Sequence, residues 1–403
     1  FTIWLGQVFS LLGSQLVQFA LIWHLTAQTG SAVTLTFAVL AEMLPGVVLM
    51  PFIGTWTDRL NRRKVMIIAD STIALITIGL LSLFVLGKIQ IWHIYLAMLI
   101  RSTCERFHMS AMGASTVMLV PQEHLARVQG MNQALNGGMN LFSAPLGAFL
   151  LAQFAISSVL MIDFLTAMLA VLPLLFFKIP QPQRTNEAST FWQDLHEGVR
   201  FVMRWRGLVI SLCMVTFINF VLTPTIALTP LLVTQHFGRG VQALGWMNAA
   251  IAVGIIVGGV ILGIWGGFKR KIILAMLGLS GLGVGTLILG IMPAAWFWGA
   301  LIAQIFTGLM IPFCNGSFGA IMQSIIPAEL QGRVFGFIMS AATAISPLGL
   351  LIAGPLAQRL GIQWWFILGG SVTLALGVLG FMIPSLMHME DHVIDPPLTA
   401  VEA

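Results

Sequence analysis

Apolar runs of about 20 residues follow one another along almost the whole sequence. A helix of that length crosses the roughly 30 Å hydrocarbon core of a bilayer, where an open chain could not satisfy its backbone hydrogen bonds. Only 8% of the 403 residues are charged and 58% are hydrophobic. A soluble domain carries about 25% charged residues. The chain is therefore expected to be an all-α integral membrane protein.

Twelve such runs can be distinguished, and each predicts a transmembrane helix. They lie near residues 3–26, 32–55, 65–86, 91–117, 128–151, 157–178, 208–231, 243–266, 271–292, 295–320, 334–356 and 364–386. The first run is longer than the core of a signal peptide and lacks a small-residue cleavage site, so we expect a retained helix.

The basic residues alternate with the predicted spans. Most of them fall in the connections near residues 59–64, 178–206 and 269–271, on one side of the membrane if the spans alternate, whereas Lys88, Arg239 and Arg359 fall on the other. The positive-inside rule makes the first side cytoplasmic, together with both termini. Nucleic-acid binding is not needed to explain the basic composition. We expect a multi-pass protein of the bacterial inner membrane.

The chain also repeats itself at an offset of just over 200 residues. PQEHLARVQG at 121–130 matches PAELQGRVFG at 327–336, and GTWTDRLNRRK from Gly54 matches GIWGGFKRK from Gly263. Parallel repeats of this kind predict two six-helix bundles related by a pseudo-two-fold axis. The expected domains are residues 1–178 and 208–386, with a linker at 179–207 and a disordered cytoplasmic tail at 387–403.

The linker carries an amphipathic pattern. Phe191, Leu195, Val199 and Val202 share one helical face, and acidic and basic residues occupy the other. We expect a helix that lies in the plane of the cytoplasmic membrane surface. A plain tether between the two bundles is the alternative to a regulatory role.

Polar residues recur at helical spacing on the first, fourth, seventh and tenth predicted helices. Because a polar group that faces lipid is costly, these faces should point at one another or at water. The predicted substrate-cavity residues are Gln7, Ser14, Gln15, Gln18, Asn219, Thr223, Gln304 and Asn315. Simple hydrogen bonding between helices is the alternative.

The chemistry of an enzyme or of a cofactor protein is not apparent in the sequence. Cys104, Cys213 and Cys314 all fall in predicted spans without metal-ligand spacing. The sequence contains no phosphate-binding GxxxxGK[ST] loop and no nucleophile–base set. We expect no catalytic residues, no metal and no cofactor.

Ionisable residues inside the spans are candidates for proton coupling, because a charge at that depth is costly. Glu42 and Arg101 should lie at similar depth, and Glu105 lies one turn beyond Arg101 on the same face. Arg101 keeps its charge, whereas a desolvated carboxylate beside it can gain or lose a proton. The hypothesis is that Glu42 or Glu105 takes up a proton and loosens a contact with Arg101.

Several alternatives accompany this hypothesis. Arg101 and Glu105 may equally be read as a static pair at i, i+4. His108 is a candidate relay, whereas for Asp163 a structural hydrogen-bonding role competes with proton transfer. Asp70 is expected to pair with the basic loop before it. Arg106 has no evident partner.

The loop GTWTDRLNRRK resembles a signature of the major facilitator superfamily between its second and third helices. The resemblance rests on Gly54, Asp58, Arg59, Arg62 and Arg63, and it implies a latch that locks the two bundles together in one conformational state. Asn61 replaces the usual second glycine, and it is expected to tolerate the left-handed backbone of such a turn.

Further motifs are similar to those of bacterial macrolide-efflux permeases, which are proton-linked drug exporters. They are FTIWLGQ at the start, TGSA at 29–32, LIRS at 99–102, GRVF at 332–335 and SPLGLLIAG at 346–354. Arg101 resembles the fourth-helix arginine of related antiporters. Gly137, Gly138 and Pro145 resemble part of an antiporter motif, whose physical content is close backbone packing and a kink.

The resemblance implies a monomeric secondary transporter that exports amphipathic, macrolide-like drugs by proton antiport through alternating access. Its partners would be a small amphipathic substrate, protons and membrane lipid. An exporter of an endogenous metabolite such as a siderophore, or a lipid-translocating protein, is the alternative.

Overall fold

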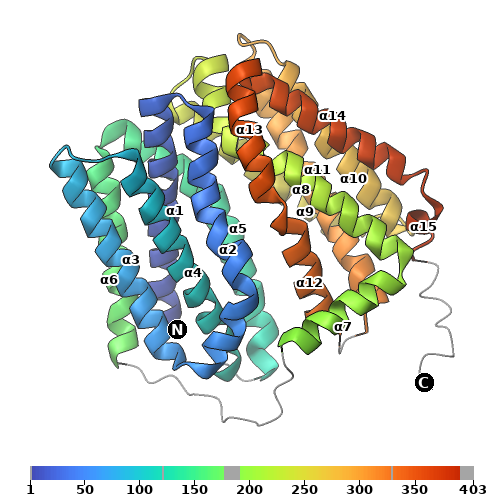
Figure 1. Ribbon diagram of the computed structural model, residues 1–403, viewed down its shortest axis with the longest axis horizontal. Coiled ribbons are helices and arrows are strands. Elements are labelled where there is room, and N and C mark those ends of the chain that lie inside the picture. Colours follow the sequence, from blue (N-terminus) through green and yellow to red (C-terminus); the bar gives the residue numbers. More distant parts are fainter. Residues whose placement is uncertain (1, 120–121, 177–190, 328–329, 391–403) are drawn as a thin grey trace. The chain divides into compact units, whose positions relative to one another are not determined.

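The computed structural model describes residues 2–119, 122–176, 191–327 and 330–390. Within these ranges the chain is helical apart from short turns, and no residue of them forms a strand. The all-α prediction is confirmed. In chain order (Figure 1), the helices are α1 (Thr2–Thr29), α2 (Ala32–Arg59), α3 (Arg62–Val85), α4 (Ile91–Leu119), α5 (Gln122–Gln153), α6 (Ile156–Phe176), α7 (Phe191–Arg204), α8 (Arg206–Leu231), the π-helix η1 (Leu232–His236), α9 (Val241–Trp265), α10 (Lys271–Ile291), α11 (Phe297–Ile325), α12 (Gln331–Ala344), α13 (Ser346–Leu360), α14 (Ile362–Gly380) and α15 (Pro384–Met387).

A helix occupies each of the apolar runs found in the sequence. Ten helical segments of the described chain are long and apolar enough to cross a membrane. Helices α4 and α5 are not among them, although they contain 29 and 32 residues. In α4 the reason is visible in the sequence, because Arg101, Glu105 and Arg106 lie within six residues of one another. The protein is thus a multi-pass membrane protein.

The chain divides into two compact units, which are described separately below. The first unit comprises residues 1–188, 227–249 and 350–359, and the second comprises residues 189–226, 250–349 and 360–403. Helices α1 to α6 of the first unit therefore come from the first of the two predicted domains. The predicted domain boundaries at 178, 207 and 386 remain predictions.

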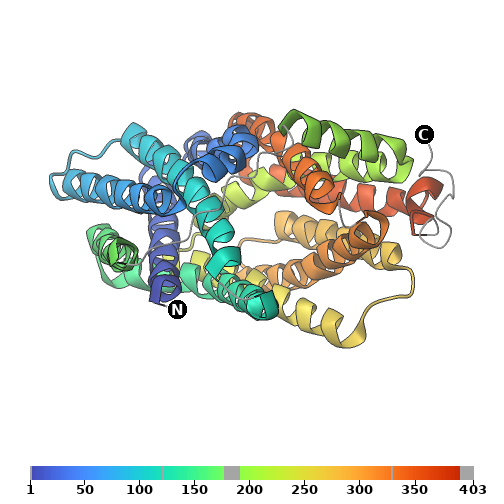
Figure 2. The ribbon, with the colours of Figure 1, turned by 90° about the horizontal axis from the view of Figure 1, so that it is seen from below.

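In the first unit, α3 and α4 lie side by side, and α3 also packs on α6 (Figure 2). Helix α1 packs on α6 and on α5, and α2 packs on α4. Three helices, α1, α3 and α4, therefore surround one interior together with α6. Polar residues on these faces are held away from lipid, as their cost in hydrocarbon requires.

Local capping sets the helix boundaries around α2 and α3. Gly30 ends α1 with a φ of 56°, and the Ser31 hydroxyl accepts a hydrogen bond from the Thr34 amide at the start of α2. The carboxamide oxygen of Asn61 accepts a bond from the Lys64 amide, 3.1 Å away, at the start of α3. These are the side chains that N-caps favour.

The left-handed backbone predicted at Asn61 is wrong. Asn61 has φ −69° and ψ 108°, an extended conformation that any residue adopts. Asparagine is useful here because its side chain caps α3, and a glycine at this position would leave one of the first amide groups without that partner.

In the second unit, α10 packs on α14 and α11, and the linker helix α7 packs on α12. The expected amphipathic helix is present, but protein covers part of its apolar face: Val202 is fully buried in a core with Leu208 and Val334. A salt bridge between Glu197 and Arg333 adds a polar contact. The side chains of Phe191 and Leu195 lie outside the described residues.

The segment after α14 is anchored on the same unit. Leu386 is fully buried and Met389 is 2% exposed. The Glu390 carboxylate accepts hydrogen bonds from the Lys271 and Ile272 amides at 3.2 and 2.9 Å, and so caps the N-terminus of α10. Residues 391–403, most of the predicted tail, lie outside the described residues.

Close approach of two helices in the second unit depends on a pair of glycines. A Cβ added to Gly254 on α9 would lie 2.1 Å from the Ile305 carbonyl oxygen on α11. A Cβ added to Gly308 on α11 would lie 2.1 Å from the Ile251 carbonyl oxygen on α9. Small residues that let backbones touch in this way drive helix association in membranes.

We predict that Gly254→Val lowers the free energy of unfolding by about 1–3 kcal/mol, because the added side chain must push α9 and α11 apart. Gly259 on the same helix is the matched control, since a Cβ there meets no atom of the protein within 4 Å. Thermal unfolding of the purified variants in detergent measures the difference. Equal melting of Gly254→Val and Gly259→Val would contradict the close approach.

Candidate functional site

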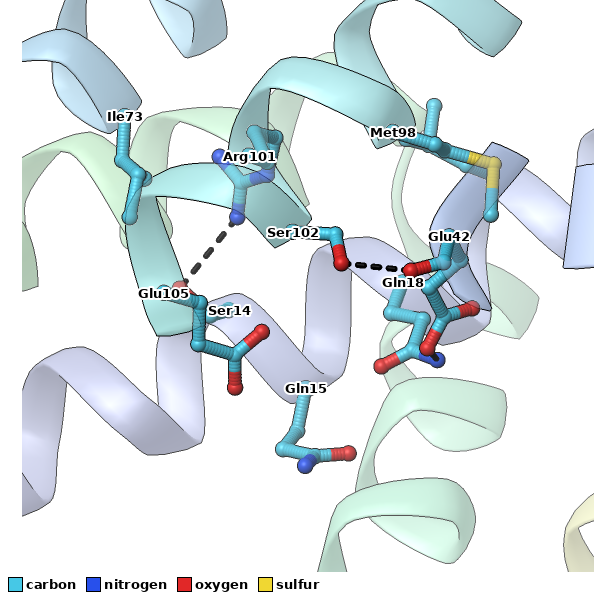
Figure 3. Close-up of a pocket in the computed structure, with 10 residues that line it drawn as sticks. Ser14, Gln15, Gln18, Glu42, Ile73, Met98, Arg101, Ser102 and Glu105 are labelled. Carbon is cyan, nitrogen blue, oxygen red and sulfur yellow. Dashed lines mark hydrogen bonds between the residues drawn. The ribbon is translucent and has the colours of Figure 1, made fainter. Parts of the chain in front are cut away.

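A cavity lies inside the first unit, among α1, α2, α3 and α4 (Figure 3). It contains about 450 Å³ of space, part of it open solvent. The side chains that line it are Ser14, Gln15, Gln18, Leu21, Glu42, Ile73, Met98, Arg101, Ser102 and Glu105. The lining thus combines two carboxylates and several hydrogen-bonding groups with an apolar part made by Leu21, Ile73 and Met98.

The two carboxylates of the cavity have different surroundings. The Gln18 side-chain amide donates a hydrogen bond to the Glu42 carboxylate, and the Ser102 hydroxyl donates one to the Glu42 backbone carbonyl (Figure 3). The Glu105 carboxylate points into the same space. Among the described residues no hydrogen bond or ion pair to it is found.

Arg101 is held at the edge of the cavity by a buried ion pair. Its Nη1 atom lies 2.7 Å from Oδ2 of Asp163 on α6, and the Asp163 side chain is fully buried. Nη1 also donates to the Thr77 hydroxyl, and Nη2 donates to the Ser14 hydroxyl at 3.3 Å. The Thr77 hydroxyl in turn donates to Asp163 at 2.8 Å. Four helices therefore contribute to one neutral cluster, which we call the upper polar layer.

The partner of Arg101 differs from the one that the sequence suggested. Sequence spacing favoured Glu105 on the same helix or Glu42 on α2, whereas the guanidinium binds Asp163. The reason is tertiary: α1 and α6 approach closely at Gly13, where an added Cβ would lie 3.0 Å from Asp163 Oδ1. The carboxylate thus meets Arg101 in the interior, and the two glutamates keep the cavity.

A second buried cluster lies deeper along the same helices, and we call it the lower polar layer. Nδ1 of His108 on α4 lies 2.9 Å from Oδ1 of Asp70 on α3. The Gln7 side-chain amide on α1 donates to Asp70 Oδ2 at 3.2 Å. All three residues are at most 4% exposed.

Asp70 was expected to pair with the basic loop, and that prediction is wrong. Of that loop, Arg63 instead donates hydrogen bonds of 2.6 Å to the Leu174 and Leu175 carbonyls at the end of α6. Arg106, which had no evident partner, places its guanidinium beside Gly46 of α2, where an added Cβ would lie 3.4 Å from Nε.

The sequence contained a signal for these two layers that the analysis above missed. Gln7 and Ser14, Asp70 and Thr77, and Arg101 and His108 are each seven residues apart on their helices. Seven residues are almost two turns, so each pair lies on one face with a separation of about 10 Å. Thr77 and Ser102 were overlooked because a single hydroxyl in a span is usually unremarkable.

The candidate cavity residues of the second unit lie apart from this cavity. Asn219 donates to the Ala342 carbonyl at 3.1 Å, and the Thr223 hydroxyl donates to Ser346 at 3.3 Å, so both join α8 to the α12–α13 region. Gln304 is buried on α11. Asn315 lines an apolar pocket of the second unit together with Met214, Met276 and others.

The residues of the two family motifs are described only in part. The side chains of Gly54, Asp58 and Arg59 lie outside the described residues, and Arg62 is buried. A Cβ added to Gly137 or Gly138 would meet nothing within 4 Å, so close packing at these two glycines is not observed. Close packing is found instead at Pro145, which lies near Gly245 of α9.

The residues that the structure describes include no group of three histidine, cysteine or acidic side chains that could hold a metal ion. What the first unit offers is a solvent-filled cavity with carboxylates and amides, built on a bundle of membrane-crossing helices. Such an arrangement binds and moves small molecules or ions. The fold and the site together define a membrane transporter.

Comparison with known proteins gives the family. The model of the major facilitator superfamily matches residues 3–229 and 208–392, and the chain belongs to that superfamily. Macrolide efflux protein A of Streptococcus pyogenes is 31% identical over 392 residues, which cover 97% of both chains. The multidrug efflux pump Tap of Mycobacterium tuberculosis is 26% identical and covers 91% of this chain and 89% of its own.

Solved structures agree on the fold. The nucleoside transporter NupG superposes with a TM-score of 0.71 at 12% identity over 96% of this chain and 100% of its own. A bacterial homologue of the human lysosomal transporter Spinster gives a TM-score of 0.66 at 11% identity and covers 97% of each chain. The predicted major facilitator fold is confirmed.

We predict that Arg101→Gln lowers the free energy of unfolding by about 3–5 kcal/mol, because Asp163 is left as a buried charge without its counter-ion. Arg106→Gln on the same helix is the control, since Arg106 is exposed. The double variant Arg101→Gln/Asp163→Asn should recover part of the loss. Thermal unfolding in detergent tests this, and equal melting of the two single variants would refute the pairing.

Proposed function

We propose that this protein is a secondary active exporter of amphipathic drugs, macrolide-like in character, driven by proton antiport through alternating access. The observation that carries the proposal is the cavity of the first unit, in which Glu42 and Glu105 face the same space as Leu21, Ile73 and Met98. The efflux proteins named among the relatives add support. The protein would act as a monomer in the bacterial inner membrane, with both termini in the cytoplasm.

The lining suits a molecule with one polar and one apolar part. Aliphatic and methionine side chains adapt to apolar shapes, and the amides of Gln15 and Gln18 can either donate or accept hydrogen bonds. A substrate amine, which is cationic near neutral pH, would be attracted to the carboxylates. The residues Asn219, Thr223, Gln304 and Asn315 would serve the second unit's share of the pathway.

Coupling would arise from competition at the carboxylates. Arg101 stays charged and Asp163 neutralises it, so this pair gives the cavity a fixed, neutral wall. Glu42 and Glu105 are then the groups whose protonation can change when substrate arrives or leaves. A proton and a cationic substrate that compete for one carboxylate produce exchange in opposite directions.

The latch proposed for Gly54, Asp58, Arg59, Arg62 and Arg63 belongs to the same cycle. Arg63 already ties the start of α3 to the end of α6 through the carbonyls of Leu174 and Leu175. A charged loop held in this way could exchange partners when the bundles move. Gly137, Gly138 and Pro145 on α5 would contribute to the same motion.

The substrate proposal is tested in a bacterial host that lacks its own drug pumps. Expression should raise the tolerated macrolide concentration, and an uncoupler that collapses the proton gradient should abolish the gain. Unchanged sensitivity to every macrolide would instead favour the export of an endogenous metabolite such as a siderophore. Movement of labelled lipid without drug transport would favour lipid translocation.

The coupling proposal is tested with Glu42→Gln and Glu105→Gln in inside-out vesicles. We predict that the double variant loses drug uptake driven by a pH gradient, by about 100-fold or more, because neither amide can carry a proton. Glu197→Gln on α7 is the control, since that carboxylate lies outside the cavity and pairs with Arg333. Full gradient-driven transport by the double variant would rule out these carriers.

A further inference from the structure

The lower polar layer has a charge property that the upper layer lacks. In the upper layer Arg101 and Asp163 are one cation and one anion, and arginine does not release its proton in proteins. That layer therefore has a fixed net charge of zero. In the lower layer the cationic partner would be His108, and imidazole is the side chain that changes charge near neutral pH.

The contact geometry requires a proton between His108 and Asp70. Nδ1 and Oδ1 are 2.9 Å apart, and two atoms that both carry lone pairs cannot form a hydrogen bond without one. If His108 is neutral, Nδ1 carries its proton and the pair has a net charge of −1. If a second proton binds at Nε2, the imidazolium and the carboxylate sum to zero. The pair thus exchanges one proton without losing its hydrogen bond.

The surroundings offer this pair no other compensating charge. Helix α1 presents the amide of Gln7, and α6 carries a single ionisable residue, Asp163, already bound to Arg101. From α4, Cys104 and Arg101 face the pair, and Glu105 lies three residues from His108 on the same helix. Arg62, Arg63 and Lys64 begin α3, with Arg63 engaged by α6. A net charge of −1 buried here is costly, so the dry layer favours the protonated form.

We propose that His108 and Asp70, supported by Gln7, form a second proton-binding site that receives protons from the cavity and releases them to the cytoplasm. The site lies about two helical turns beyond Arg101, toward the end where α3 begins with its basic residues. Glu105 and His108 at i, i+3 are neighbours on the surface of α4. The proton would pass from the Glu105 carboxyl to the imidazole, and then to water that enters when the cytoplasmic end opens.

This inference rests on the proposed antiport and names the exit of its proton. Gln7 connects the site to α1, whose next polar residues, Ser14, Gln15 and Gln18, line the cavity. Gain or loss of the proton changes the strength with which Asp70 holds Gln7. A change of charge in the lower layer is thereby felt by a helix that contacts substrate.

The test uses the full-length protein in proteoliposomes and the variants His108→Asn and Asp70→Asn. Asparagine places an amide N–H near the position of Nδ1, so it can keep the hydrogen bond to Asp70 but does not titrate. Gradient-driven drug transport should fall about 100-fold or more, whereas downhill exchange of drug without a pH gradient should persist. His24→Asn is the matched control, because His24 packs edge-on against Phe84 at the other end of α1. Full gradient-driven transport by His108→Asn would overturn the proposal.

A second measurement is independent of transport. In the purified protein with isotope-labelled histidines, one imidazole signal that is absent in His108→Asn should titrate near neutral pH, and Asp70→Asn or Gln7→Leu should displace its titration. A His108 signal that does not titrate would overturn the site even if the variants transport poorly or fold poorly. Titration in a wild-type protein that never moves drug against a pH gradient would support proton binding at this site and reject the proposed antiport instead.

Discussion

A positive charge buried inside a membrane-crossing bundle must be neutralised within the protein, and Arg101 is such a charge. Its counter-ion Asp163 comes from α6, and the hydroxyls of Thr77 and Ser14 come from α3 and α1. One side chain thus requires four helices to meet at a fixed depth. The first unit is organised around that meeting, because a missing partner would leave an uncompensated charge in a low-dielectric interior. The close approach of α1 to α6 at Gly13 serves the same contact.

Satisfying Arg101 in this way determines what the rest of the site can do. Since Asp163 takes the guanidinium, Glu42 and Glu105 are left to the cavity, with only amide and hydroxyl contacts around the first. Groups that keep a constant charge build the wall, and groups that can change their charge face the solvent or the lower layer. This separation of fixed and variable charge is what a proton-coupled transporter needs. It also makes His108 and Asp70 more than a structural pair in the proposed cycle.

Much of the fold follows from the sequence, and much of the site does not. The apolar runs predicted every helix that crosses the first unit, and the charges of α4 explain why that helix is less apolar than the others. Glu42, Arg101 and Glu105 were correctly expected to meet around one cavity with Ser14, Gln15 and Gln18. The partners of Arg101 and Asp70 were not predicted, because helical spacing relates residues on one helix, whereas both partners lie on neighbouring helices. Asn61 was likewise misjudged, since its cap depends on the course of the chain into α3.

The sequence by itself determined that this chain is a helical membrane protein of a transporter family, because hydrophobic length and charge placement are properties of the linear chain. It also determined which polar residues share a helical face, since 3.6 residues per turn fixes that relation. Only the tertiary structure decided which opposite charges meet, because pairing depends on the rotation and depth of each helix against its neighbours. For this protein that decision gave Asp163 to Arg101 and His108 to Asp70, and left the two glutamates in the cavity.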